Sequence, residues 1–404
     1  MKALVLAAAK SPKLEPFSST RPKSMIFLGG EHILETTLKR IKEAGINEVI
    51  LVVGHQREMI QEAFHYGKKL ELKIDYLIQE EEQGIGKAVL LAEEKLKQEE
   101  HFLLVYGDTL MSGNQFLHLS NHFQTAPDGN LAAITHPVLE GGYGNIYLGH
   151  DMKINRFIEK PEGGRLSNYI FGGSFILERG IFERLHQNQG DMVALWHSLI
   201  SEGKLAASLW EDEWIDLSRP WHILRANRMI LSGWETSIIP RSCKIDSGVH
   251  IDGVVHMGEN VHVCSGTTIV GPCYIGDNSF IGHSSLLRDH CSIGPNSSIG
   301  YGTEIKNSVI FGEAKIGRLS FLGDSVIGER VLMGSGTITI NYLPEQKNLS
   351  SLGKDKVAIP TGLPKVGSFV GDNSHIGAGN ILAPGTLIKA DSFFEDRFNI
   401  QSNL

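Results

Sequence analysis

The sequence predicts two domains of different fold class: an α/β doubly wound domain over residues 1–233 and an all-β parallel β-helix over residues 234–404. Two patterns support this division. In the first part, short apolar runs alternate with stretches of helical period. In the second part, an aliphatic residue recurs at every sixth position. A chain of 404 residues is also longer than a single hydrophobic core usually serves.

The elements of the first domain follow one another as strand and helix. Continuous apolar runs that end in polar loops are typical of buried parallel strands. The expected strands are Met1–Ala8, Glu48–Gly54, Lys73–Gln79 and His101–Tyr106, and the expected helices are Ile33–Ala44, Glu58–Tyr66 and Gly86–Lys97. In such a sheet, ligands bind beyond the carboxyl ends of the strands. The loops after Ala8, Gln79 and Tyr106 are therefore the expected place of the chemistry.

The second domain repeats every six residues from Ile245 to Ile305. Neither an α-helix nor a flat sheet has that period. A strand-and-turn unit of six residues, three units to a coil, gives a triangular β-helix with one aliphatic side chain per face directed inward. The repeat resumes out of phase after Ile305, and a polar insertion over 343–365 interrupts it. Such an insertion predicts a loop on one face of the solenoid.

Charge and cysteine usage exclude several function classes. The net charge is −8 and no stripe of Lys and Arg is visible, which argues against a general nucleic-acid binder. No stretch is long enough to span a bilayer, so we expect a cytoplasmic protein without a membrane partner. Cys243, Cys264, Cys273 and Cys291 show no C-x-x-C pairing or neighbouring-histidine pattern. We expect small buried thiols.

The loop after the first strand, from Leu6 to Phe17, resembles the L-A-A-G-x-G-T-R-L-x-P signature of sugar-1-phosphate nucleotidylyltransferases, and Pro22-Lys23 resembles the P-K that follows it. Six further segments follow in the order of that family: Gln79 with Gly84-Ile85-Gly86, Gly107-Asp108, Tyr143-Gly144, Glu159-Lys160-Pro161, Asn168 with Gly172-Gly173, and Trp214-Ile215-Asp216. The resemblance implies a nucleotide-diphospho-sugar transferase-like fold. It also implies that an NTP and a sugar 1-phosphate give a nucleotide-sugar and pyrophosphate.

The resemblance further implies a role for each matching position. Asp108 and Asp216 would be hard oxygen ligands for Mg²⁺. Lys13 and Lys23 would be the catalytic residues, with positive charge directed at phosphate. Nucleotide binding is assigned to Leu6, Ala8, Ala9, Gln79, Gly84 and Gly107, and sugar binding to Gly144, Glu159, Lys160 and Asn168.

The signature loop departs from the family at four positions. Two glycines become Ala9 and Ser11, the threonine becomes Pro12, and the arginine becomes Lys13. Glycines let backbone N–H groups curl toward phosphate, whereas Pro12 removes a donor. Lys13 keeps the charge but lacks the two-pronged contact of arginine. Three hypotheses follow: a nucleotidylyltransferase with a divergent loop, a catalytically impaired nucleotide-sugar-binding or scaffold homologue, or an enzyme that carries out another reaction on a nucleotide-sugar.

Two segments of the solenoid, Lys315–Asp324 and Gly334–Tyr342, resemble the acetyltransferase half of bifunctional UDP-N-acetylglucosamine pyrophosphorylase/glucosamine-1-phosphate N-acetyltransferases. In the acyl-site pattern, Arg318 replaces the general-base histidine and Phe321 replaces a tyrosine, while Asn341 is kept. Arginine stays protonated near neutral pH, so acetyl transfer is not expected, although acetyl-CoA binding stays open. The resemblance implies a left-handed β-helix that assembles as a homotrimer.

Overall fold

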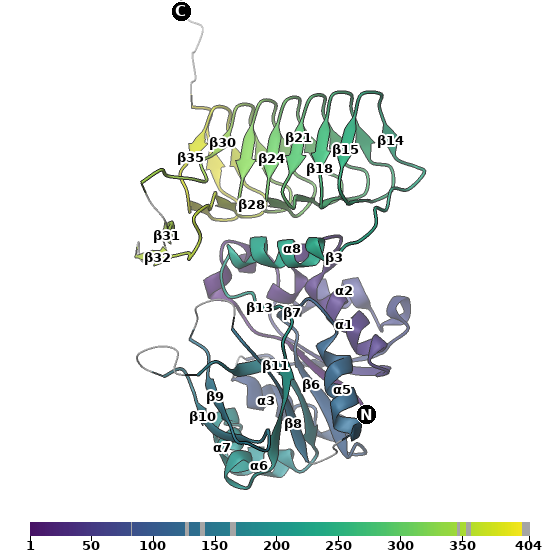
Figure 1. Cartoon of the computed structure of the whole chain (residues 1–404), viewed down its shortest axis with the longest axis vertical. Coiled ribbons are helices and arrows are strands. Elements are labelled where there is room, and N and C mark those ends of the chain that lie inside the picture. The colour runs from purple at the N-terminus through teal and green to yellow at the C-terminus, as the bar shows by residue number, and fades with distance from the viewer. Residues whose placement is uncertain are drawn as a thin grey trace, which may run out of the picture. The chain divides into compact units, whose positions relative to one another are not determined.

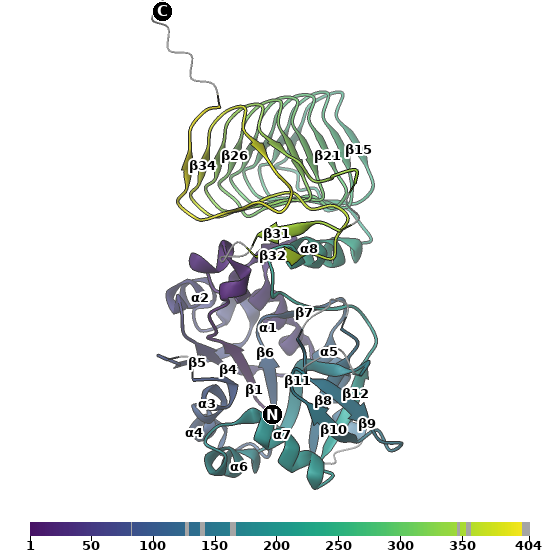
Figure 2. The ribbon, with the colours of Figure 1, turned by 90° about the vertical axis from the view of Figure 1, so that its left-hand side faces the viewer.

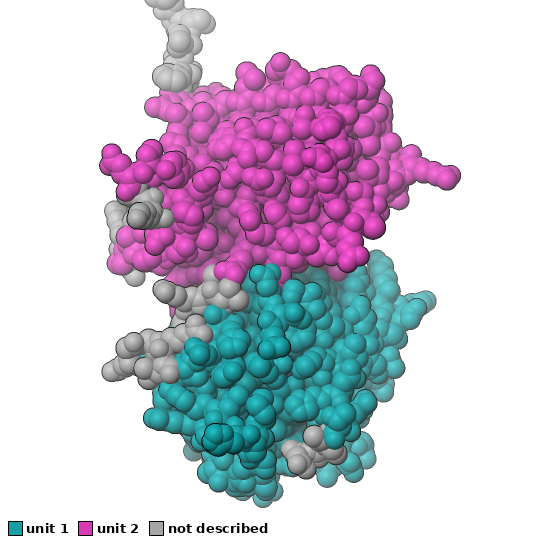
Figure 3. Space-filling view, viewed as in Figure 1, with its two compact units in different colours: residues 1–10, 21–25, 32–216 teal, residues 11–20, 26–31, 217–404 magenta. Residues whose placement is uncertain are grey.

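The computed structural model describes residues 1–81, 83–125, 129–137, 142–161, 167–345, 348–352 and 357–397. They form two compact units, shown in Figure 3. Unit 1 comprises Met1–Lys10, Arg21–Met25 and His32–Asp216, and unit 2 comprises Ser11–Thr20, Ile26–Glu31 and Leu217–Leu404. Two segments of the N-terminal region therefore belong to the same compact unit as the solenoid.

Unit 1 is built on a seven-stranded sheet of order β12-β8-β11-β6-β1-β4-β5. Its strands are β1 (Ala3–Ala7), β4 (Glu48–Val53), β5 (Lys73–Ile78), β6 (His101–Tyr106), β8 (Asn130–Thr135), β11 (Ile170–Glu178) and β12 (Leu205–Trp210). The pairs among β1, β4, β5 and β6 are parallel, whereas β11 runs antiparallel to β6 and β8. Each of the four strands expected from the sequence is present.

Helices cover both faces of this sheet, as Figure 1 shows. One face packs against α1 (Ile33–Glu43), α2 (Arg57–Phe64) and α5 (Gln115–Thr125), and the other against α3 (Ile85–Leu90), α4 (Glu93–Leu96), α6 (Ile181–Gln187) and α7 (Met192–Ser201). Within β1, Ala3 and Val5 join the first core and Leu4 joins the second, as the alternation of a strand requires. The doubly wound fold is thus confirmed, with the helix expected at Gly86–Lys97 divided into α3 and α4.

Short elements complete the first 232 residues. They are β2 (Phe27–Leu28), β3 (Glu31–His32), β7 (Thr109–Met111), β9 (Asn145–Leu148), β10 (Ile154–Ile158), β13 (Trp214–Asp216), and the 3-10 helices Pro12–Leu14, Phe17–Ser19, Lys23–Met25 and Lys68–Leu70. Helix α8 (His222–Ser232) belongs to unit 2.

The solenoid of unit 2 consists of three parallel sheets whose strands recur once per coil. The first contains β14 (Lys244–Ile245), β17 (His262–Val263), β20 (Phe280–Ile281), β23 (Ser298–Ile299), β26 (Lys315–Ile316), β29 (Leu332–Met333), β34 (His375–Ile376) and β37 (Phe393–Phe394). The second contains β15 (His250–Asp252), β18 (Thr268–Val270), β21 (Leu286–Arg288), β24 (Glu304–Lys306), β27 (Phe321–Gly323), β30 (Ile338–Thr339) and β35 (Ile381–Leu382). The third contains β16 (Val255–Met257), β19 (Cys273–Ile275), β22 (Ser292–Ile293), β25 (Val309–Ile310), β28 (Val326–Ile327), β33 (Phe369–Val370) and β36 (Leu387–Ile388). Figure 2 shows the stacked coils of this left-handed parallel β-helix.

The six-residue period accounts for the solenoid core except in the first coil, where Ile245 is exposed and Ile251 is half-buried. Val263, Ile281 and Ile299 are fully buried and pair with one another at the same place on successive coils. Ile245 was expected inside but is 40% exposed, because the first coil has no further coil against its outer side. Ile293 pairs with Ile310 and Ile299 with Ile316, 17 positions apart instead of 18, because the step that follows Ile305 is one residue shorter, and this is the phase shift seen in the sequence.

The expected insertion is also present. Strand β29 pairs with β34, 43 positions later, instead of 18 as between β17 and β20. The intervening chain carries an antiparallel pair, β31 (Ser350–Leu352) and β32 (Ala358–Pro360).

Residues 11–20 and 26–31 pack against the solenoid within unit 2. Leu14 and Phe17 are fully buried, and the Phe17 ring lies 5.1 Å from that of Phe311. Thr20 Oγ1 donates a hydrogen bond of 2.7 Å to Asp372 Oδ2. These contacts attach the N-terminal segment to the solenoid within unit 2.

The four cysteines are free thiols. Cys264, Cys273 and Cys291 are buried as expected, and Cys243 is half-buried. Among the described residues, no helix has the length and apolar character needed to cross a membrane.

Candidate active site

Two carboxylates, Asp108 and Asp216, come together through a short antiparallel strand pair. Asp108 follows β6 after a single residue, Gly107, at the carboxyl end of the parallel strands. Asp216 ends β13, which pairs with β7 so that Asp216 lies opposite Thr109. This pairing places Asp216, the last residue of unit 1, near the carboxyl end of β6, where the sequence predicted the chemistry.

The ammonium group of Lys23 lies between these carboxylates. Its Nζ donates to Asp108 Oδ2 at 2.9 Å and to Asp216 Oδ1 at 2.5 Å. The Lys23 side chain is 8% exposed. Burial lowers the pKa of Lys23, but the charges and hydrogen bonds of the two carboxylates outweigh burial, so the pKa is raised above its usual value. Lys23 is therefore a charged ammonium ion at physiological pH.

The same carboxylates fit a magnesium ion. They come from separate elements and already converge on one cationic atom. Mg²⁺ prefers oxygen ligands and is usually held by one or two carboxylates together with water and substrate phosphate. Asp108 and Asp216 are the residues that would hold it, and Lys23 would then release at least one of them.

A cavity of about 300 Å³ adjoins the carboxylates. Asp108 and Asp216 line it, together with three of the predicted sugar-binding residues, Gly144, Glu159 and Lys160. Its aromatic lining comes from Tyr106, Tyr143, Phe157, Phe171, Trp196 and Trp214. A concave site with mostly apolar walls and a few convergent polar groups is typical of small-molecule binding.

Gly144 shows why the Tyr-Gly motif needs its glycine. A Cβ atom at this position would stand 2.4 Å from the Phe157 ring and 3.0 Å from Glu159 Oε2. The preceding Tyr143 packs edge-to-face on Trp214, with ring centroids 5.9 Å apart. The motif therefore joins the β9–β10 region to the strand that carries Asp216.

The remaining predicted sugar residue, Asn168, is exposed and is not among the residues that line this cavity. Its carbonyl oxygen lies 3.1 Å from His136 Nδ1.

The residues predicted to bind the nucleotide do not line the cavity. Gly107 N donates to Leu6 O at 2.9 Å, and a Cβ on Gly107 would stand 3.0 Å from that oxygen. Gln79 Nε2 donates to Gly84 O at 3.4 Å, and Gly84 has a φ of +91°, which favours glycine. Ala8 is half-buried and Ala9 is exposed at the start of the signature loop.

The two predicted catalytic lysines belong to different compact units. Lys23 is in unit 1, whereas Lys13 is exposed in the 3-10 helix Pro12–Leu14 of unit 2. Leu14 beside it is fully buried in unit 2. The buried apolar residues of the loop therefore determine where it packs. Lys13 consequently belongs to a different compact unit from Asp108 and Asp216.

In the solenoid, Phe321 and Asn341 lie against the same glycine. A Cβ on Gly323 would stand 2.7 Å from Phe321 Cζ and 2.6 Å from Asn341 Nδ2. Asn341 Nδ2 also donates to Asp324 Oδ2 at 2.5 Å. Arg318 is exposed in the turn before β27.

Sequence reasoning missed the part of the cavity wall that comes from α7. Met192, Val193 and Trp196 line the cavity from this helix, and Trp196 stacks on Phe175 with centroids 4.8 Å apart. The only sequence signal is Asp191, whose carboxylate caps the helix by accepting from Val193 N at 2.8 Å. Such a cap marks a helix start but does not reveal what the helix faces.

Tyr106 is a further cavity residue that the motifs did not include. Burial raises the pKa of its hydroxyl group, and the charges of Asp108 and Glu159 raise it further. Tyr106 is therefore a neutral hydrogen-bonding group in this cavity.

The fold and the paired carboxylates are those of a nucleotidyl transferase, and the similarity of the chain to known proteins agrees with this class. Residues 2–233 match the family model described as Nucleotidyl transferase, and residues 269–359 match that of the GMPPB C-terminal domain. The chain belongs to the nucleotidyl transferase family. The resemblance seen in the motifs is thereby confirmed.

Full-length relatives carry both halves of the chain. The chain is 38% identical to the bifunctional protein GlmU of Methanococcus maripaludis strain C7, over 97% of this chain and 92% of that protein. It is 29% identical to the bifunctional sugar-1-phosphate nucleotidylyltransferase/acetyltransferase of Sulfurisphaera tokodaii, over 96% of this chain and 94% of that protein. A putative glucose-1-phosphate thymidylyltransferase from Bacillus anthracis, in complex with a sucrose, shares the fold. Its TM-score is 0.52 and its identity 18%, over 56% of this chain and 94% of that one.

Proposed function

We propose that unit 1 is a sugar-1-phosphate nucleotidylyltransferase that joins an NTP and a sugar 1-phosphate. One observation supports this above the others: the Lys23 ammonium ion binds Asp108 and Asp216, and both carboxylates line the cavity that also contains Gly144 and Glu159. A cation site beside a cavity with sugar-binding groups is what this reaction requires. The family and the full-length relatives agree with it.

In this reaction a phosphate oxygen of the sugar 1-phosphate forms a bond to the α-phosphorus of the NTP. The bond from that phosphorus to the bridging oxygen breaks, and pyrophosphate leaves with the electron pair. Asp108 and Asp216 would hold Mg²⁺, which supplies positive charge to the phosphate oxygens. Lys23, freed from one or both carboxylates, would neutralise phosphate charge.

The remaining predicted roles are part of the same proposal. Glu159 accepts hydrogen bonds from sugar hydroxyls, Gly144 leaves room for the ring, and Lys160 and Asn168 contribute from the rim of the site. On the nucleotide side, Gln79 and Gly84 contact the base, and Lys13 contacts phosphate. Leu6, Ala8, Ala9 and Gly107 form the surface on which the nucleotide lies.

A second candidate is a catalytically impaired homologue that binds a nucleotide-sugar or serves as a scaffold. The position of the signature loop favours it, because residues 11–20 belong to unit 2 and Pro12 lacks an N–H donor. The two candidates differ in turnover, since both allow binding.

A pyrophosphate-release screen distinguishes them. The purified protein with Mg²⁺ is crossed with four NTPs and dTTP and with a panel of sugar 1-phosphates. We expect turnover with at least one pair and a loss of at least about a hundredfold in Asp108→Asn, because one metal ligand is removed. The matched control is Asp75→Asn, an exposed carboxylate on β5 that pairs with Lys95 at 3.3 Å, and it should retain full activity. Absence of turnover with every pair would favour the impaired homologue.

We further propose that the solenoid does not transfer acetyl groups. The guanidinium of Arg318 cannot accept a proton from an amine at neutral pH. Release of CoA from acetyl-CoA in the presence of glucosamine 1-phosphate would contradict this proposal. Calorimetry with acetyl-CoA tests separately whether the region around Phe321 and Asn341 binds the cofactor.

We also propose a homotrimer assembled through the β-helix. Sedimentation velocity at micromolar concentration should give the mass of three chains, whereas a monomer at that concentration would contradict the proposal.

A further inference from the structure

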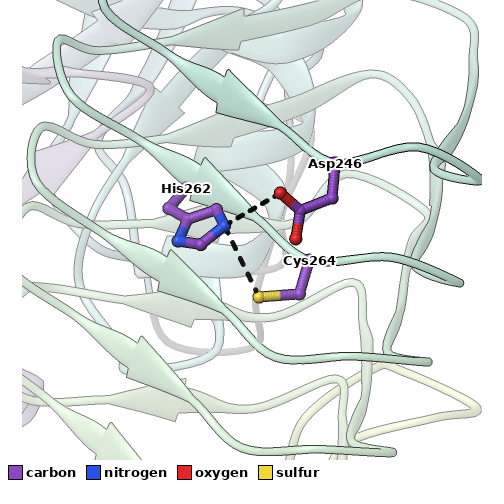
Figure 4. Close-up of side chains that lie close together, drawn as sticks. All are labelled: Asp246, His262 and Cys264. Carbon is purple, nitrogen blue, oxygen red and sulfur yellow. Dashed lines mark hydrogen bonds and ion pairs between the residues drawn. The ribbon is translucent and has the colours of Figure 1, made fainter.

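Three side chains at the start of the β-helix, Asp246, His262 and Cys264, turn toward one another, as Figure 4 shows. Their proximity follows from the 18-residue coil. Strand β14 pairs with β17 so that Lys244 lies opposite His262, which places Asp246 and Cys264 at the same position on neighbouring coils. His262 lies in β17, and Cys264 follows the end of that strand, with its sulfur near the His262 ring.

The ligand atoms have the spacing of a metal site. His262 Nε2 lies 3.3 Å from Asp246 Oδ1 and 3.8 Å from Cys264 Sγ, and all three ligand atoms lie within 4.8 Å of one another. In a tetrahedral zinc site with bonds of about 2.0–2.3 Å, neighbouring ligand atoms are about 3.3–3.8 Å apart. The contacts of His262 with Asp246 and with Cys264 match this range.

We propose that Asp246, His262 and Cys264 bind a zinc ion. Sulfur, imidazole nitrogen and carboxylate oxygen form a donor set that zinc accepts and magnesium does not favour. As the sulfur–zinc bond forms, the thiol proton passes to solvent. Among the described residues this is the only group of three such ligands, and it lies in unit 2, so it is distinct from the carboxylate pair of unit 1.

The exposure of the three side chains indicates where the ion enters, and their position on two neighbouring coils indicates what the ion does. The side chains of Asp246 and His262 are 25% and 30% exposed, whereas Cys264 is 2% exposed. The ion therefore enters from the side of Asp246 and His262, and a water molecule completes the coordination there. The Lys244 ammonium lies 3.7 Å from Asp246 Oδ1 and competes with the ion for this carboxylate. A bound zinc ion would clip the first coil, where Ile245 is exposed, to the second.

Cobalt serves as the spectroscopic probe for this site. The full-length protein is dialysed against a chelator and titrated with Co²⁺ and then with Zn²⁺. We expect a thiolate-to-cobalt charge-transfer absorption that saturates at one ion per chain and disappears when Zn²⁺ is added. Co²⁺ bound by Asp108 and Asp216 has no thiolate ligand and does not give this absorption, so the readout is independent of the proposed enzymatic site.

Variants identify the ligands. Cys264→Ser should lose the absorption, and the matched control Cys243→Ser should keep it, because Cys243 Sγ lies outside the cluster and contacts Gly258 O at 3.2 Å. His262→Gln keeps the thiol and should bind Co²⁺ at least tenfold more weakly. Circular dichroism confirms that each variant is folded. Absence of the absorption in the wild-type protein, or an equal absorption in Cys264→Ser, would overturn the proposal.

Discussion

At the scale of single residues, the Lys23 ammonium and the carboxylates of Asp108 and Asp216 form a cluster with one positive and two negative charges. Removing one partner from a buried ion pair leaves uncompensated charge and is costly. Here the cation can be replaced, because the carboxylates also fit Mg²⁺. We therefore expect Lys23 to hold the two carboxylates together when no metal is present and to be available to phosphate when one is bound.

Replacing Lys23 by methionine tests this balance. Without Mg²⁺, Lys23→Met should lower the free energy of unfolding by about 3–5 kcal/mol, because two partly buried carboxylates lose their counter-charge. Added Mg²⁺ should stabilise the variant more than the wild type, in which the ammonium competes for the site. Urea denaturation with and without Mg²⁺ measures both effects.

The control for this variant is Lys39→Met. Lys39 pairs with Glu35 at 2.9 Å on the surface of α1, and its loss should change stability by less than about 0.5 kcal/mol.

The contribution of Lys23 to stability should also depend on pH. Because the pKa of Lys23 is raised in the folded state, its stabilising contribution should be fully present below pH 10.5, the ordinary pKa of lysine, and should fade only as pH rises through the higher folded pKa. Equal stability of Lys23→Met and wild type without Mg²⁺ would contradict the charge argument.

Gly144 provides a second test at this scale. Gly144→Ala places a methyl group 2.4 Å from the Phe157 ring and should destabilise the protein by about 1–3 kcal/mol. The displaced Phe157 and Glu159 should also raise the KM for the sugar 1-phosphate. Gly180→Ala is the matched control, since Gly180 lies outside the cavity and the nearest atoms to its new Cβ belong to the Glu178 side chain at 3.8 Å. Steady-state kinetics and thermal unfolding of both variants would show whether space at Gly144 matters.

At the scale of elements, the β-helix is a repeat in which each coil buries one aliphatic side chain per sheet. The stability of such a solenoid depends on contacts between neighbouring coils. An interior position has coils on both sides, whereas the first coil has one on a single side. The same hexapeptide position therefore differs in burial along the solenoid, from fully buried at Ile299 to 40% exposed at Ile245.

This difference predicts the cost of truncation at each position. Ile299→Ala should lower the free energy of unfolding of the solenoid by about 2–5 kcal/mol, because a cavity forms between packed coils. Ile245→Ala removes the same atoms from an exposed site and should cost less than about 0.5 kcal/mol. Thermal unfolding followed by circular dichroism compares the two, and an equal cost would contradict the assignment of Ile299 to the interior.

At the scale of the whole molecule, the compact units do not divide the chain at a single point. Residues 11–20 and 26–31 pack with the solenoid, while 21–25, which contain Lys23, return to unit 1. The signature loop is thus fixed at one end by the buried strand β1 and at the other by the packing of Phe17 on Phe311.

A cytoplasmic location of the protein stays a prediction from the sequence.

Unit 2 should accordingly be less stable without its N-terminal segments. A fragment of residues 234–404 lacks Phe17, α8 and Gly30, whose backbone lies against the Tyr274 ring. Its melting temperature should be below that of the solenoid transition in the full chain, and its exposed Phe311 should promote aggregation. If the fragment melts at the same temperature as the full chain, the N-terminal segments contribute nothing to the solenoid.

Local patterns were enough to predict much of this protein. The six-residue period determined the β-helix and its interior, because a side chain's place in a coil depends only on its position in the repeat. The apolar runs determined the strands of unit 1, and the motif order determined the family. The carboxylate pair was also expected, because Gly107-Asp108 and Trp214-Ile215-Asp216 resemble two motifs of the family.

Tertiary structure decided which of these residues meet. The pairing of β13 with β7 brought Asp216 to Asp108, and α7 supplied a cavity wall that no motif contains. Packing placed Lys13 and Lys23 in different compact units, although they stand only ten positions apart in the chain. It also placed Asp246 beside His262 and Cys264, where the sequence had shown no zinc pattern. The physical reason is that burial of apolar side chains and the stacking of coils act between segments far apart in the chain, and local patterns contain no information about those distances.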